Sequence, residues 1–210
     1  MKRMELKPQK NYWKPSLLKC KNHKNFSTQM RKVILNVAVS LDFMIAGPNG
    51  EYDWCFTDQD YGMSDFMKRI DSLFMGRKTY ELLLKVDPNS YPGFKRFVFS
   101  NSLKQIENAQ LISGNWKETV DTILQSEGKD IWLFGGADLT HHFLENNLID
   151  EMSLAVHPII LGNGKPLFHS FRERKKIILK ETKTFSSGLV QLCYTRSQLK
   201  SEGLIKKMAN

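Results

Sequence analysis

Two short segments of the chain combine a buried strand, glycine and the start of a helix, an arrangement suited to binding phosphate groups. The first covers residues 73–81 around Gly76, and the second covers residues 130–139 around Gly135 and Gly136. Glycine lets the backbone approach a ligand closely because it carries no Cβ atom. A helix start adds free N–H groups and the positive end of the helix dipole. Two such junctions predict a protein that binds a phosphorylated dinucleotide.

The first junction also carries side chains that match a phosphate. Arg77 offers a planar fork of donors, Lys78 completes a basic pair, and Thr79 supplies a hydroxyl. Ser100 and Asn101 follow a predicted strand, and ligands of open α/β sheets bind at the carboxyl ends of strands. The competing interpretation of Arg77 and Lys78 is a solvated basic pair at an ordinary helix start. The competing interpretation of Ser100 and Asn101 is an ordinary capped turn.

The loop over residues 41–58 supplies candidates for contacts with a reacting ring. Small Ala46 would let a flat ring lie against the backbone, and we predict that Asp42 and Trp54 contact the substrate, although Asp42 is also placed to cap the loop. A reductase acting on a ring C=N or C=O bond needs an acid or an ordered water nearby. Asp53 is the favoured acid, but a surface carboxylate without a chemical role is an equally good interpretation. Two further carboxylates compete with it: Asp58 and Asp60.

The net charge of +9 is concentrated at the two ends of the chain. Residues 1–29 carry a net +7 and residues 200–210 a net +2, so the segment between them is neutral. A basic domain would favour nucleic acid or an anionic membrane, and the neutral segment favours neither. We expect one domain over residues 30–198 and a basic tail over 199–210. Residues 1–29 are interpreted as a disordered tail, a misassigned upstream extension or a targeting segment.

Cysteine and histidine placement argues against a metal site. The three cysteines are scattered without a CxxC pair, which is typical of a reduced, cytoplasmic protein. The adjacent His141 and His142 do not share a helix face, and His157 is expected to be packed or hydrogen-bonded in a turn. No run approaches the roughly 20 apolar residues that a membrane span requires.

Alternating apolar runs and turn residues predict an α/β fold. A hairpin turn is expected over residues 185–188, between the last two strands. The pattern therefore predicts a mostly parallel central sheet that ends in an antiparallel C-terminal hairpin. Helices are expected over residues 59–70, 78–84, 116–125 and 137–145, and strands over 33–39, 73–75, 96–99, 131–134, 151–156, 176–181 and 189–195.

Four motifs follow one another along this domain. They are Ser40-Leu41-Asp42-x-x-Ile45-Ala46, Met75-Gly76-Arg77-Lys78-Thr79-Tyr80-Glu81, Phe134-Gly135-Gly136-Ala137-x-Leu139 and Pro158-Ile159-Ile160-Leu161-Gly162-x-Gly164. In this order and spacing they resemble the dihydrofolate reductase superfamily, and most closely the stand-alone relatives of the RibD C-terminal reductase domain of riboflavin biosynthesis. The resemblance covers about residues 31–196. It implies a dihydrofolate-reductase-like three-layer sandwich that binds NADPH across the carboxyl ends of the strands.

The resemblance also implies which residues contact the cofactor. Arg77 would lie near the adenosine 2′-phosphate, and an unusual peptide would join the two glycines of the second junction. The implied cofactor-binding residues are Ala46, beside Ile45, at the nicotinamide; Gly76, Arg77, Lys78, Thr79, Ser100 and Asn101 at the first group of phosphates; and Gly135, Gly136, Ala137 and Leu139 at the second turn.

The chain departs from the family pattern in two places. Phe43 stands where a glycine commonly follows the Leu-Asp pair, and it would fill part of the pocket. No carboxylate can be placed on the helix that holds the pterin in true dihydrofolate reductases. The chain also lacks the HxE and PCxxC motifs of a deaminase module.

These observations favour a cytoplasmic NADPH-dependent reductase that acts on a small heteroaromatic or carbonyl substrate. Pterins and ribosylaminopyrimidine-like compounds are the first substrates to consider. Two alternatives stay open: a catalytically silent protein that only binds NADP(H) or another nucleotide, and a nucleic-acid-associated protein that acts through its basic leader. An exposed strand of the last hairpin also favours a homodimer.

Overall fold

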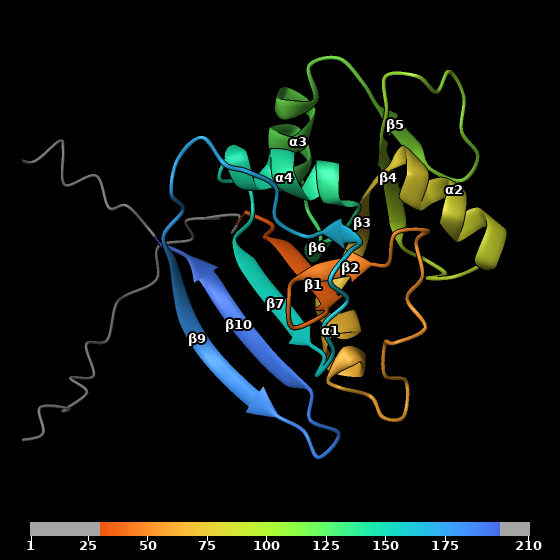
Figure 1. Cartoon of the computed structure of the whole chain (residues 1–210). Coiled ribbons are helices and arrows are strands. Elements are labelled where there is room, and N and C mark those ends of the chain that lie inside the picture. The colour runs from red at the N-terminus through yellow and green to blue at the C-terminus, as the bar shows by residue number, and fades with distance from the viewer. Residues whose placement is uncertain (1–29, 198–210) are drawn as a thin grey trace, which may run out of the picture.

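A computed structural model describes residues 30–197, and they form three layers: two helices, a central sheet and two further helices (Figure 1). Helices α3 (Trp116–Gln125) and α4 (Ala137–Glu145) cover one face, and α1 (Met63–Arg69) and α2 (Arg77–Val86) pack on the other. The three-layer fold is thus confirmed. The predicted leader over 1–29 and basic tail over 199–210 lie outside the described residues.

The central sheet has eight strands in the order β5-β4-β3-β6-β1-β7-β10-β9. Its first six strands are parallel, while β10 pairs antiparallel with β7 and β9, so the predicted C-terminal hairpin is confirmed. A separate small sheet joins β2 (Met44–Ala46) to β8 (Lys165–Pro166). The central strands are β1 (Val33–Val39), β3 (Ile70–Gly76), β4 (Lys95–Phe99), β5 (Gln110–Ile112), β6 (Asp130–Gly135), β7 (Glu151–Val156), β9 (Ile177–Thr184) and β10 (Val190–Arg196).

The core lies mainly between the sheet and the α3–α4 layer. Phe74 of β3 and Phe143 of α4 are both 0% exposed, and their ring centroids are 5.7 Å apart. Burying a side chain of this size contributes about 1.5–3 kcal/mol. On the opposite face, Phe66 of α1 meets the edge of Trp132 at 5.2 Å, and Tyr80 of α2 is buried beside the same cluster. Both faces of β3 and β6 are therefore covered, as expected for a parallel sheet.

Sequence reasoning was wrong about the first helix. Instead of covering residues 59–70, α1 spans only Met63–Arg69. Tyr61 and Gly62 both have left-handed backbone angles, φ +51° and +83°, so a continuous helix cannot pass through them. At the other end Ile70 takes an extended conformation and begins β3. The three short strands β2, β5 and β8 were also missed, because three residues or fewer carry no readable period.

The edge strand β9 is exposed along its whole length, including the apolar Ile177, Ile178 and Leu179. A register shift opposite Cys193 and Tyr194 makes a bulge in β9, and the strand also carries Lys180 and Lys183. Bulges and lysines discourage the pairing of an edge strand with another chain. The homodimer expected from this hairpin stays a prediction. Within residues 30–197, no helix is long and apolar enough to span a membrane.

A buried arginine joins the amino-terminal ends of the middle strands. Arg31, just before β1, is 4% exposed, and its Nε donates to the carbonyl of Lys129 at 2.6 Å. Its guanidinium also donates to the Asp71 carboxylate and, at 2.7 Å, to the Ser72 hydroxyl. A Cβ atom on Gly128 would come within 2.9 Å of this guanidinium, so the turn before β6 requires glycine. One side chain thereby fixes the relative positions of β1, β3 and β6.

We predict that Arg31→Met lowers the free energy of unfolding by about 3 kcal/mol in urea titrations. This is the lower end of the range for breaking a buried ion pair, because the Asp71 side chain is 29% exposed. The control Lys68→Met removes an exposed pair with Asp65 and should cost less than about 0.5 kcal/mol. Equal stability of the two variants would contradict a central role for Arg31.

Candidate functional site

The two glycine junctions meet at the carboxyl edge of the sheet because β3 and β6 are neighbours. Met75 pairs with Gly135 across these strands, so Gly76 and Gly136 emerge side by side. The hydroxyl Oγ1 of Thr79, in the first turn of α2, accepts the N–H of Gly136 at 3.0 Å. Residues 57 positions apart in the sequence are thus joined directly.

Both helices that start here leave their first N–H groups without a side-chain cap. The residues before α2 and α4 are Gly76 and Gly136, neither of which has a capping side chain. Gly135 has φ +97°, which only glycine adopts readily, and a Cβ on Gly136 would lie 3.3 Å from the Thr79 hydroxyl. Two uncapped helix N-termini at one edge form a favourable environment for phosphate groups.

The remaining predicted cofactor residues surround these turns. Arg77 pairs with Glu81 at 2.9 Å on α2 and stays partly exposed, while Lys78 is exposed. Ser100 and Asn101 follow β4, the strand next to β3. The Ser100 hydroxyl accepts the N–H of Leu103 in the same loop, and the Asn101 side chain accepts the N–H of Gly114, beyond β5. Ala137 is half-buried at the start of α4, whereas the Leu139 side chain is buried in the core. The described peptide bonds are all trans, so the unusual peptide expected between the glycines is absent there.

Asp42 is occupied by structural hydrogen bonds at the end of β1. Its carboxylate accepts the Ser40 hydroxyl at 2.6 Å and the N–H groups of Leu161 and Gly162 at 3.1 and 2.8 Å. These bonds, the Ser40 hydroxyl first, lower the pKa of Asp42 to about 2. They tie the 158–164 motif to the first strand, while the predicted substrate contact of Asp42 stays a prediction.

Close backbone packing explains two further motif positions. A Cβ on Gly164 would overlap the carbonyl oxygen of Ala46, so the glycine lets this loop lie directly against β2. Phe43 has φ +59°, a left-handed conformation that explains why a glycine is common there. Its ring is partly exposed and packs against Phe168, with 5.9 Å between centroids.

The loop over residues 47–62 is fixed by a buried histidine after β7. His157 is 2% exposed, its Nε2 accepts the N–H of Phe56 at 3.1 Å, and its Nδ1 faces the Ala155 carbonyl at 3.0 Å. The interpretation of His157 as a hydrogen-bonded, packed residue therefore agrees with the geometry. Trp54 packs edge-on against the same ring at 5.3 Å.

The predicted acid lies on the exposed side of this loop. Asp53 is exposed, and its carboxylate makes no hydrogen bond to any residue within 30–197. Burial, followed by the charge of Asp53, raises the pKa of the Cys55 thiol to about 11. The competing carboxylates have partners, since Asp58 accepts the Tyr61 hydroxyl at 2.7 Å and Asp60 accepts the Ser64 hydroxyl at the same distance.

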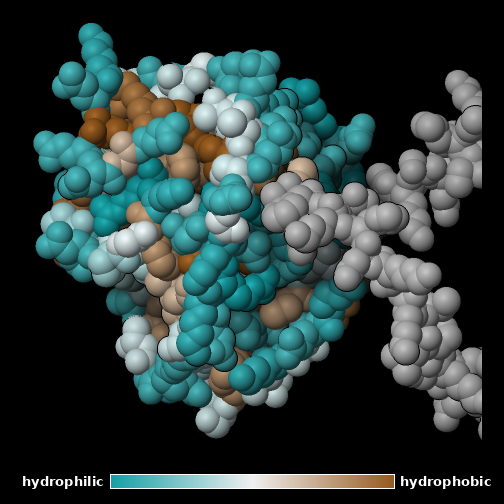
Figure 2. Space-filling view, turned by 180° about the vertical axis from the view of Figure 1, so that it is seen from behind, coloured by the Kyte–Doolittle hydropathy of each residue, from teal (hydrophilic) through white to brown (hydrophobic). Residues whose placement is uncertain are grey.

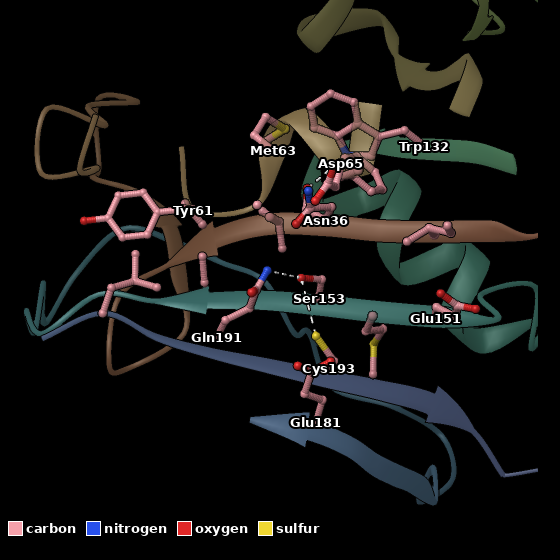
Figure 3. Close-up of a pocket in the computed structure, with 18 of the residues that line it drawn as sticks. Asn36, Tyr61, Met63, Asp65, Trp132, Glu151, Ser153, Glu181, Gln191 and Cys193 are labelled. Atoms are coloured by element: carbon pink, nitrogen blue, oxygen red, sulfur yellow. Dashed lines mark hydrogen bonds between the residues drawn. The ribbon is translucent and has the colours of Figure 1, made fainter. Parts of the chain in front are cut away.

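A groove of about 950 Å³ runs between α1 and the uncovered part of the sheet (Figure 3). Its lining begins near Phe56 and His157 at the carboxyl edge and continues along β1, β7 and β10. Asp42, Asp53 and Trp54 are outside this lining. Sequence reasoning missed the residues of its floor. It placed no carboxylate on the substrate-binding helix, and in the structure Asp65 of α1 lines the groove.

The remaining candidates for metal binding do not gather. Within residues 30–197, no group of three or more histidine, cysteine, aspartate or glutamate residues is placed to hold a metal ion. His141 and His169 do approach each other, with ring centroids 5.5 Å apart. The surface seen from behind is mostly hydrophilic, with hydrophobic side chains in separate areas (Figure 2).

Comparison with known proteins gives consistent results. The sequence model of the RibD C-terminal domain matches residues 31–191. The chain is 41% identical to YyaP of Bacillus subtilis, an uncharacterised protein, over 79% of this chain and 95% of that one. A putative riboflavin biosynthesis protein from Shewanella superimposes with a TM-score of 0.72 at 28% identity, over 80% of this chain and 99% of that one. The fold also matches the Thermotoga maritima deaminase/5-amino-6-(5-phosphoribosylamino)uracil reductase, with a TM-score of 0.61 at 16% identity, over 81% and 58%.

We predict that Asp42→Asn destabilises the protein only at a pH where Asp42 is ionised. A depressed folded-state pKa contributes stability above the ordinary value of 3.8, and this contribution is lost as the pH falls through about 2. The difference in unfolding free energy between parent and variant should therefore shrink over this interval in urea titrations. A difference that stays constant across it would contradict the structural role. Asp121→Asn, which changes an exposed carboxylate on α3, is the control.

Proposed function

Because the chain belongs to the RibD C-terminal domain family, we propose that it is an NADPH-dependent reductase. It would transfer hydride to a small heteroaromatic compound of the pterin or ribosylaminopyrimidine type, or to a carbonyl compound. The observation that carries this proposal is the hydrogen bond between Thr79 and Gly136, which places two uncapped helix N-termini at one edge of the sheet. Free thiols at Cys55 and Cys193 are consistent with a cytoplasmic location.

The residues at this edge fit a phosphorylated dinucleotide. The backbone N–H groups after Gly76 and Gly136 would hold the pyrophosphate, and Arg77 would pair with the 2′-phosphate. Ala46, a small residue in β2, would border the nicotinamide. NADPH supplies the hydride when it is bound. The protein would hold this ring against the substrate at the mouth of the groove and exclude water from the contact.

The reduced atom also needs a proton, and we assign its delivery to Asp53 or to a bound water. Asp53 lies in the loop that Phe56 and His157 attach to the carboxyl edge, and its carboxylate is not occupied by another described group. A loop carboxylate of this kind can exchange protons with solvent and pass one to the substrate.

The alternative is a protein that binds NADP(H) without turnover. Two observations favour this alternative over an active reductase. Asp42, the carboxylate nearest the end of β1, is already saturated by three hydrogen bonds, and Phe43 covers part of the surface beside Phe168. Such a protein would bind the cofactor as the reductase does and would give no oxidation of NADPH with any pterin or pyrimidine.

We predict that NADPH binds saturably and more tightly than NADH, as measured by energy transfer from tryptophan to the nicotinamide. Arg77→Ala should weaken NADPH binding at least tenfold, because a charge-assisted hydrogen bond to a phosphate is lost, and should change NADH binding little. Glu81→Gln, which removes the partner of Arg77 but keeps the arginine, should preserve NADPH binding. Absence of binding by both cofactors would contradict the proposal.

A second variant pair tests the contact between the junctions. Thr79→Val removes the acceptor for the Gly136 N–H and should weaken NADPH binding by about threefold to tenfold, the effect of one hydrogen bond. Thr79→Ser keeps the hydroxyl and should bind NADPH nearly as the parent does. If valine and serine variants behave alike in the same titration, the hydroxyl is not what positions the second turn.

A further inference from the structure

The groove described above has a polar floor where the middle of a sheet is usually apolar. Asn36 of β1 lies directly opposite Ser153 of β7, and Ser153 lies opposite Cys193 of β10, so the three form a row across the sheet. Gln191, on the same face, donates from Nε2 to the Ser153 hydroxyl at 2.9 Å (Figure 3). These side chains are half-buried. Buried polar groups need hydrogen-bond partners, so a ligand that displaces water from this row has to supply them.

Two groups of this row keep unused hydrogen-bonding capacity toward the groove. The side-chain amide of Asn36 makes no hydrogen bond to any residue within 30–197, although its backbone carbonyl accepts the indole N–H of Trp132 at 3.0 Å. The amide oxygen of Gln191 likewise receives no hydrogen bond from the described part of the chain. An amide presents a donor beside an acceptor, which matches the N–H and C=O groups of a cyclic amide.

The shape of the groove around this row suits a flat ring. Ala38 and Ala155, both on the floor, are small and leave the space above the strands open. The opposite wall is aromatic, with Phe66 of α1 and Trp132 of β6 packed edge to face. Aromatic walls above a floor of small residues bind planar groups through a large apolar contact.

The charges of the groove do not favour an anionic ligand. Lys32 and Arg69 are both paired with Glu151, at 2.8 and 2.9 Å. Arg69 is also paired with Asp130 at 3.1 Å. The charged residues that line the groove are Lys32, Arg69 and Lys180 against Asp60, Asp65, Glu151 and Glu181, so acidic groups outnumber basic ones.

We propose that the groove binds an uncharged, planar heterocycle with an amide-like edge and without a phosphate group, held by Asn36 and Gln191 against the Phe66–Trp132 wall. This inference rests on the proposed function and deepens it, because it gives the substrate class of a groove whose lining reaches the carboxyl edge of the sheet at Phe56 and His157. It disfavours phosphorylated substrates, because the four carboxylates of the groove outnumber its three cations and two of those cations, Lys32 and Arg69, are already paired.

The first test is binding of lumazine, a fluorescent pteridinedione, to the full chain at a pH where its ring is uncharged. Two matched probes keep the ring: 1,3-dimethyllumazine lacks the amide N–H groups, and lumazine-6-carboxylate adds a negative charge. We expect lumazine to bind at least tenfold more tightly than either probe. Equal binding of lumazine and its dimethyl derivative, or tighter binding of the carboxylate, would overturn the proposal.

Variants then locate the contact. Asn36→Leu, close in volume, should weaken lumazine binding about tenfold and leave 1,3-dimethyllumazine unchanged, since only an amide contact is lost. Gln191→Met is a second, independent variant if the first reduces folding, which circular dichroism reports. Lys183→Met, on the exposed edge strand and outside the groove lining, is the control and should bind lumazine as the parent does. A parent-like affinity in both groove variants would overturn the assignment.

Cofactor titration separates this inference from the proposed function. Asn36→Leu should bind NADPH as the parent does, because Asn36 lies three residues before the end of β1 and away from the glycine turns. Lumazine binding without NADPH binding would support the groove and contradict the reductase. NADPH binding without lumazine binding, with a dimer seen by light scattering, would instead show that a second copy covers the groove.

Discussion

The interaction on which the other features depend is the buried guanidinium of Arg31. The pKa of Arg31 is lowered from its ordinary value, because the effect of burial exceeds the opposing effect of the Asp71 and Asp130 carboxylates. The guanidinium contacts Asp71 and Ser72 at the beginning of β3 and Lys129 just before β6. Arg31 itself lies just before β1 in the sequence. The ladder between β3 and β6 connects this end of the sheet to the far edge, where a register shift between Phe74 and Met75 brings Met75 opposite Gly135. The alignment of the glycine turns therefore depends on this ladder and on the strand positions that Arg31 holds.

Sequence patterns predicted elements that show a clear period. The helix boundaries at 116–125 and 137–145 agree with the structure because Val120, Ile123, Leu139 and Phe143 recur at helical spacing and bury one face. The first helix was mispredicted because the left-handed backbone at Tyr61 interrupts an apolar spacing that looks continuous. Only tertiary contacts decide such a conformation.

The candidate site was predictable to a similar degree. Glycine between a strand end and a helix start is visible in the sequence, so the turns at Gly76 and Gly135 were predicted, while their phosphate-binding role stays a prediction. The contact of Thr79 with Gly136 and the row of Asn36, Ser153 and Gln191 could not be found, because each needs the strand order and register. A polar residue in an apolar strand is the one signal that could have pointed to Asn36.

The central position of β1 has a consequence for how the chain reaches its fold during synthesis. Val33 pairs with Ile131, 98 residues later, and Ile34 pairs with Glu151, so the earliest described strand receives its neighbours only after a long stretch of chain has followed. Until then its apolar run stays exposed to the solvent and to chaperones. Contacts this distant in sequence slow the folding of a domain. Completion of the domain thus waits for the ribosome to release β6 and β7, and a chain that stalls before that point remains open to aggregation.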